Sequence, residues 1–120
     1  MTVQLKRAYA PPDPADGKRF LVDRLWPRGL RRDALLLTGW LKELAPSTEL
    51  RRWYNHVPER WEEFRTRYRS ELLSPERQAD LAYLADESAH GQITLVFGTR
   101  DTERNEAVVL KEVLEDSRDH

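Results

Sequence analysis

The spacing of hydrophobic positions changes several times along the chain, and these changes predict an alternation of strands and helices. Residues 3–8 begin with the alternation Val-Gln-Leu-Lys, which predicts a first strand. Residues 18–24, which contain Phe-Leu-Val, and the run Ile-Thr-Leu-Val-Phe at 93–97 predict two buried strands. The Pro-rich stretch at 10–17 is expected to be a rigid loop without a helix.

Between the last two of these strands, apolar residues recur every three or four positions, which is typical of amphipathic helices. Ser47 is expected to cap the first of these helices, and Pro58 stands at a tolerated first-turn position of the next. Residues 35–44 fit a helix and an extended segment equally well. The remaining predicted helices run from Ser74-Pro75 to His90-Gly91 and over residues 103–115, the last beginning near Glu103 or Arg104.

This order of elements predicts the α/β class: one domain over residues 1–120, with a small sheet that has parallel core strands and helices packed on it. A strand, a long helical connection and a second strand favour parallel pairing of 19–24 with 92–97. Their carboxyl ends would then lie side by side. The loops that follow, at 23–28 and 98–105, are therefore expected at one edge of the sheet, which is where open α/β proteins usually bind ligands.

The segment after the second strand carries the most informative chemistry of the chain. Asp23, Arg24, Trp26 and Arg28 fall within six residues, and Pro27 fixes the backbone between the last two. Two guanidinium groups, a carboxylate and an indole at a strand end could hold an anion or a planar group. Each also has a structural interpretation: Asp23 as an acceptor of backbone N–H groups, the arginines in ion pairs, and Trp26 as a cover for the core.

Two further residues are candidates for the same ligand-binding edge. Arg51 lies near the start of a predicted helix, and Asn105 either contacts a ligand or orients the last loop. The amino terminus of the last helix would add free N–H groups that favour an anion. Ser47 is interpreted as a helix cap and not as a nucleophile, because no nucleophile-elbow sequence surrounds it.

Composition narrows the class of protein. The 120 residues contain no cysteine, which excludes disulfides and most structural zinc sites, and the three histidines have no metal-ligand spacing. No apolar run approaches the roughly 20 residues of a membrane span, so a cytoplasmic location without membrane association is expected. The net charge is −1, but residues 1–32 hold eight basic and three acidic side chains. A general attraction to nucleic acid is therefore weak, although a basic amino-terminal third remains.

Three segments together resemble a known bacterial family. They are Val-Asp-Arg-Leu-Trp-Pro-Arg-Gly at 22–29, Ala-Pro-Ser-Thr-Glu-Leu-Arg at 45–51, and Asn105 with Ala107 and Leu110. The chain is similar, from about Val3 to Leu114, to the YeaO-like branch of the family called domain of unknown function 488. Because that name assigns no function, the resemblance does not indicate an activity. The wider family often has Asp-Val-Arg followed by Pro, and a cysteine-containing signature. This chain has Asp23-Arg24 and no cysteine, so thiol chemistry cannot operate here.

Three classes of function stay open from the sequence. The preferred hypothesis is a protein that binds a small anionic metabolite, phosphorylated or nucleotide-like, through Asp23, Arg24, Trp26, Arg28, Arg51 and Asn105. The alternatives are a nucleic-acid-associated protein that uses the basic amino-terminal third, and an interaction module with an apolar tryptophan patch. No nucleophile or acid–base pair is evident, so whether the protein is an enzyme stays open, as does its oligomeric state. No cofactor or metal is expected.

Overall fold

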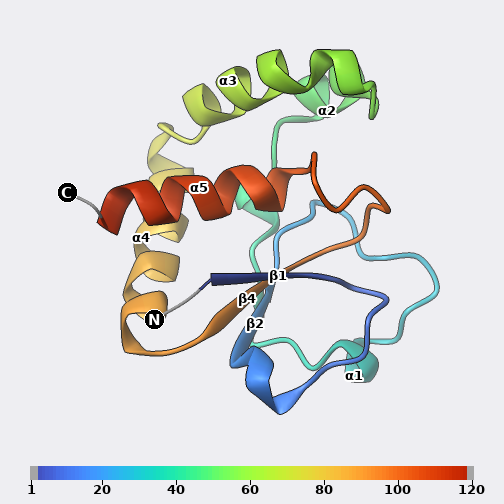
Figure 1. Cartoon of the computed structure of the whole chain (residues 1–120), viewed down its shortest axis with the longest axis vertical. Coiled ribbons are helices and arrows are strands. Elements are labelled where there is room, and N and C mark those ends of the chain that lie inside the picture. The colour runs from blue at the N-terminus through green and yellow to red at the C-terminus, as the bar shows by residue number, and fades with distance from the viewer. Residues whose placement is uncertain (1–2, 119–120) are drawn as a thin grey trace.

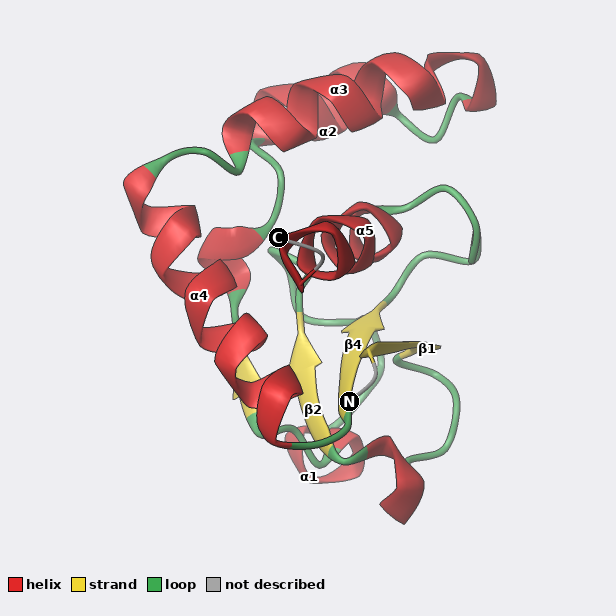
Figure 2. Ribbon diagram, turned by 60° about the vertical axis from the view of Figure 1, so that its left-hand side comes forward, coloured by secondary structure: helices red, strands yellow, loops and turns green. Residues whose placement is uncertain are grey.

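The computed structural model describes residues 3–118, whose centre is a parallel four-stranded sheet (Figures 1 and 2). The strands lie in the order β1-β4-β2-β3, and every neighbouring pair is parallel. Lys18 pairs with Ile93 and Leu21 with Val96, which confirms the predicted neighbouring strands and the α/β class. The strands are β1 (Val3–Arg7), β2 (Lys18–Leu21), β3 (Gly39–Trp40) and β4 (Ile93–Phe97).

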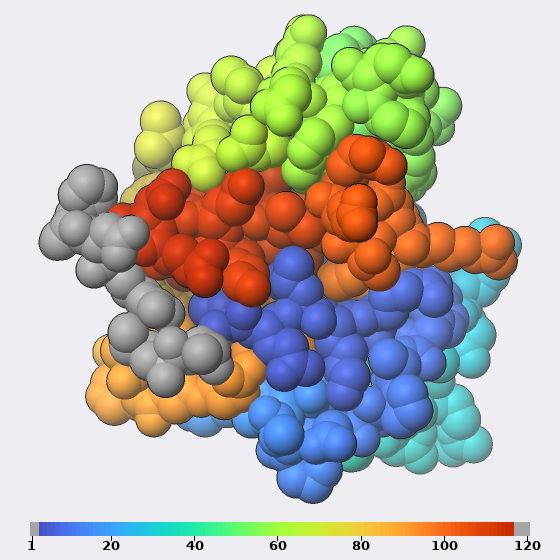
Figure 3. Space-filling model, viewed as in Figure 1, coloured from blue at the N-terminus to red at the C-terminus, as the bar shows by residue number. Residues whose placement is uncertain are grey.

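Within residues 3–118, five helices pack around this sheet. Figures 1 and 2 show α5 lying across the strands, with α3 stacked beyond it and α4 along one side. In Figure 3 the α5 segment lies between α3 and β1 on the molecular surface. The helices are α1 (Arg32–Leu35), α2 (Thr48–Tyr54), α3 (Trp61–Glu71), α4 (Pro75–His90) and α5 (Glu106–Arg118), and short 3₁₀ turns occur at Pro14–Asp16, Lys42–Leu44 and Pro58–Arg60.

The core has two parts, one on each face of the sheet. Phe20 of β2 and Leu95 of β4 belong to the larger cluster beneath the helices, where both are fully buried. Leu21 and Val96, the next residue of each strand, belong to a smaller cluster that Trp40 helps to cover. Because side chains alternate between faces, burial on both faces makes these strands continuous apolar runs. This explains why apolar runs in the sequence identified β2 and β4.

Several elements differ from the expected bounds. Strand β2 ends at Leu21, although the Val22 N–H still donates to the Val96 carbonyl at 3.1 Å. Residues 35–44 divide between the end of α1, β3 and a 3₁₀ turn. The Pro-rich loop is corrected as well, because Asp13 caps a 3₁₀ turn at Pro14–Asp16, where a proline is tolerated at the first position.

The last helix begins at Glu106, two or three residues later than predicted. The Asp101 carboxylate accepts hydrogen bonds from the backbone N–H groups of Glu103 and Arg104, both at 3.0 Å, which folds these residues into a turn. The side chain of Asn105 then accepts from the Val108 N–H at 3.1 Å, as a helix cap does. These N–H groups are therefore bonded within the protein and are not free to hold an anion.

Candidate ligand-binding site

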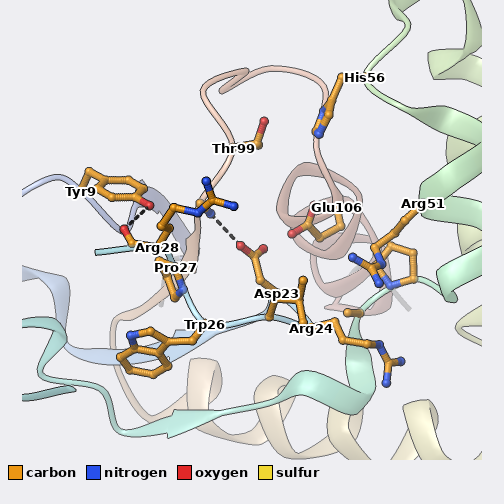
Figure 4. A pocket seen from close by; sticks show the side chains of 14 residues that line it. Tyr9, Asp23, Arg24, Trp26, Pro27, Arg28, Arg51, His56, Thr99 and Glu106 are labelled. Carbon is orange, nitrogen blue, oxygen red and sulfur yellow. Dashed lines mark hydrogen bonds between the residues drawn. The ribbon is translucent and has the colours of Figure 1, made fainter. Parts of the chain in front are cut away.

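A cavity of about 500 Å³ opens where β1, β2 and β4 end (Figure 4). Its walls come from the segment after β2, the loop after β4, the segment before α2, and the first residue of α5. Loops that are far apart in the sequence meet here because the strands are parallel and share one carboxyl edge. The volume is within the range of about 300–1,000 Å³ that small-molecule sites occupy.

Hydrogen bonds between loops hold the cavity wall in place. The Arg7 side chain of β1 donates to the carbonyls of Gly98 and Thr99, at 3.2 and 2.9 Å. The Tyr9 hydroxyl donates to the Arg28 carbonyl at 2.8 Å. These bonds connect the end of β1 to the loop after β4 and to the segment after β2, and so hold the backbone of these wall segments together.

Asp23 lies at the centre of the cavity. Its Oδ2 accepts a hydrogen bond from the Gly98 N–H at 2.8 Å, while the Trp40 indole donates to its carbonyl at 2.7 Å. The loop after β4 is close to this carboxylate, since a Cβ atom on Gly98 would lie 3.0 Å from Oδ2. Asp23 thus makes the structural contact expected of it and still faces the cavity, between Arg28 and Glu106 in Figure 4.

Glu106 forms a carboxyl pair with Asp23. Burial raises the pKa of Glu106 well above its ordinary value, and the charge of Asp23 and a hydrogen bond between the two side chains raise this pKa further. The guanidinium of Arg51 acts in the opposite direction. Glu106 therefore keeps its proton to a higher pH than an exposed glutamate does, and in that form it donates to Asp23. Two neighbouring carboxyl groups can bind hydroxyl groups, since each has oxygen atoms that accept hydrogen bonds.

Three arginine side chains reach the cavity in different ways. Arg28 is exposed, and its guanidinium points toward Asp23 in Figure 4. Arg51 extends from α2, and its Nε is buried without a hydrogen-bond partner among residues 3–118. The Nε of Arg24 is also buried without a hydrogen-bond partner among residues 3–118, while a terminal guanidinium nitrogen of Arg24 lies 3.8 Å from a carboxylate oxygen of Glu43.

The other two predicted residues have structural contacts. Trp26 lines the cavity, but its indole packs edge-on against Trp40, with ring centroids 5.4 Å apart, and donates to the Leu30 carbonyl at 2.6 Å. Asn105 is buried and lies outside the cavity wall, where it caps α5 and donates to the Asp101 carbonyl at 2.8 Å. Asn105 therefore orients Glu106, the next residue in the chain.

Sequence reasoning missed Glu106 and His56 as cavity residues. Glu106 directly follows Asn105, which was already a candidate, and this position next to Asn105 could have identified it. The helix was expected to begin at Glu103 or Arg104, so Glu106 was placed inside the helix and not at its start. His56 lies just beyond α2 and points toward Glu106 in Figure 4. Its backbone φ of 56° is left-handed, a conformation that the sequence does not reveal. Within residues 3–118, no three His, Asp or Glu side chains are grouped to hold a metal ion.

The sheet, its covering helices and the cavity at the carboxyl edge define an α/β protein with a small-molecule-sized site at its strand ends. The chain belongs to the family described as the inactive DUF488-N3 subclade, whose model matches residues 2–120. This match confirms the resemblance to the family of domain of unknown function 488.

Curated relatives cover nearly the full length of the chain. Uncharacterized protein Rv3073c of Mycobacterium tuberculosis is 45% identical over 93% of this chain and 92% of its own length. Uncharacterized protein YeaO of Escherichia coli is 40% identical over 95% of this chain and 97% of its own. No solved structure matches this chain. In the described part of the chain, no helix is both long and apolar enough to span a membrane.

Proposed function

We propose that this protein binds a small anionic metabolite, phosphorylated or nucleotide-like, in the cavity at the carboxyl edge of its sheet. The observation that carries the proposal is the meeting of Arg24, Arg28 and Arg51 at one cavity. Guanidinium groups form charge-assisted, often bidentate hydrogen bonds with phosphates and carboxylates. These three arginines gather positive charge at the cavity, although the net charge of the whole chain is −1.

The state of the acidic residues supports this proposal. Asp23 and Glu106 are the two carboxyl groups in the wall that contains Arg24, Arg28 and Arg51, and burial favours the uncharged form of Glu106. Part of the Asp23 charge is engaged by the Gly98 N–H. The description of the subclade as inactive agrees with a binding role for the chain, and not with turnover.

Calorimetric titration with inorganic phosphate and with ribose 5-phosphate tests the proposal. Arg28→Ala is the informative variant because Arg28 is exposed, so its loss should leave folding intact. We expect affinity for ribose 5-phosphate to fall about ten- to a hundredfold, as for a lost hydrogen bond to a charged group. Arg31→Ala is the matched control, since that side chain is exposed and lies outside the cavity wall.

Failure of every anion to bind would overturn the proposal. Equal losses in Arg28→Ala and Arg31→Ala would also overturn it, because the effect would then be one of general charge. Duplex DNA serves as a parallel probe. Salt-sensitive retention of DNA, together with no response to either phosphate, would favour the nucleic-acid hypothesis.

A further inference from the structure

A second hollow of about 420 Å³ adjoins the cavity and extends the site toward α2. The two spaces share four wall residues: Leu25, Arg51, His56 and Glu106. A ligand that occupies the first cavity can therefore continue into the second along this common wall. The two together are larger than a phosphate or a sugar phosphate needs, and within the range of small-molecule sites.

The second hollow adds aromatic side chains to the site. Its wall contains the buried rings of Tyr54 and Phe64, whose centroids lie 4.5 Å apart, together with polar side chains that include Thr48, Arg52 and Asn55. Leu25 lies on the shared boundary and is 67% exposed, so its side chain is available to a ligand. Leu25 and the exposed ring of His56 suit a flat ring such as a base, because stacking and apolar contacts need no matching charge.

His56 reaches both hollows because its backbone adopts a left-handed conformation. Asn55 ends α2 with a φ of 44°, and His56 continues with a φ of 56°. A left-handed residue at a helix end is ordinary for Asn, whereas a second one with a histidine side chain is sterically unfavourable. The conformation presents the imidazole beside Glu106, with its centroid 6.0 Å from the ring of Tyr54.

The carboxyl pair stands where the two hollows meet. Glu106 belongs to both walls, and Asp23 lies beside it in the first. Carboxyl oxygens accept hydrogen bonds from sugar hydroxyls, as they do for ribose in dinucleotide-binding folds. Arg28 therefore lies near the carboxyl pair in the first cavity, while Leu25 and His56 lie on the wall that the second hollow shares with it.

We propose that the ligand is a nucleoside monophosphate that spans both hollows. Its phosphate lies at Arg28, its ribose hydroxyls bond to the Asp23–Glu106 pair, and its base lies against Leu25 and His56. This assignment rests on the proposed function, since it uses the same arginine-lined cavity for the anionic group. It adds that the second hollow recognises the base, which a binding site for simple phosphates would not do.

Calorimetric titration of the full chain with four nucleoside monophosphates, AMP, GMP, CMP and UMP, tests this assignment against ribose 5-phosphate and inorganic phosphate. We expect at least one nucleotide to bind about tenfold or more tightly than ribose 5-phosphate, the gain typical of one stacked base. Leu25→Ala should reduce the affinity for that nucleotide by a larger factor than the affinity for ribose 5-phosphate, because Leu25 contacts the base in the proposed complex. Leu73→Ala is the matched control, because Leu73 is 72% exposed and lies outside both walls.

The outcomes separate this inference from the proposed function. If ribose 5-phosphate binds as tightly as every nucleotide, or if Leu25→Ala weakens both probes equally, the base site is refuted while anion binding stands. If adenosine binds as tightly as AMP, the phosphate adds nothing to the affinity, and the assignment of the phosphate to Arg28 is wrong. If no probe binds, both proposals fail.

Discussion

The left-handed backbone at His56 allows a test that separates stability from ligand binding. His56→Gly and His56→Ala both remove the imidazole from the two hollows. Only the glycine variant also removes the steric conflict between Cβ and the backbone at a φ of 56°. The two variants should therefore bind a nucleotide equally poorly and differ in stability.

The size of the stability difference follows from two opposing effects. A left-handed conformation costs a residue with a Cβ about 1–2 kcal/mol relative to its right-handed form. The glycine variant loses about 0.4–1 kcal/mol of this advantage, because its unfolded chain has more conformational freedom. His56→Gly should therefore be about 1 kcal/mol more stable than His56→Ala. For a domain of 120 residues this is a difference of roughly 3–6 °C in Tm.

Thermal unfolding by circular dichroism, at one pH and protein concentration, measures this difference. Asn55→Gly against Asn55→Ala provides a control pair, since Asn55 has a similar φ of 44° and its N–H still donates to the Arg51 carbonyl. Equal Tm values for the two His56 variants would show that residue 56 is not left-handed in solution. Unchanged AMP affinity in both variants, if AMP binds the parent chain, would show that the imidazole has no part in the site.

Three further outcomes follow from local geometry. Urea unfolding from pH 5 to 8 should show Glu106→Gln becoming more stable relative to the parent as pH rises. The raised pKa of Glu106 stabilises the folded parent at low pH, and this stabilisation is lost as pH rises, whereas glutamine does not titrate. Tyr68→Phe should lose about 1–3 kcal/mol in the same assay, because the buried Tyr68 hydroxyl donates to the Leu44 carbonyl at 2.7 Å. Gly17→Ala should prevent normal folding, judged by near-ultraviolet dichroism, because φ is 65° and a Cβ would lie 2.1 Å from the Gln92 carbonyl oxygen. A parental spectrum for Gly17→Ala, or parental stability for either of the other two variants, would contradict the reasoning for that variant.

The strand pairing could be predicted from the sequence because it depends on long-range features that the pattern preserves. Two apolar runs buried on both faces, joined by a long helical connection, leave few arrangements other than parallel neighbours. That pairing predicts the loops at 23–28 and 98–105 at one edge, and Gly98 and Thr99 of the second loop line the cavity there. The same reasoning placed Asp23 and Arg28 on one wall of the cavity.

The remaining features depend on interactions that periodicity does not encode. The start of α5 is set by the Asp101 side chain, which captures two backbone N–H groups and delays the helix to Glu106. An apolar stripe gives the face of a helix, but it fixes the ends only to within a few residues. This small displacement hid the carboxyl pair, because Glu106 was assigned to the helix interior and not to its first position.

The delayed helix start also links the structural role of Asn105 to the chemistry of the site. Asn105 is buried and caps α5 through its side chain, which fixes the direction in which the next residue leaves the loop. That residue is Glu106, whose carboxyl meets Asp23 from the neighbouring strand end. Replacement of Asn105 by alanine would remove the cap and the bond to Asp101, and would release Glu106 from its partner. A residue outside the cavity wall can therefore determine where a carboxyl group of that wall lies.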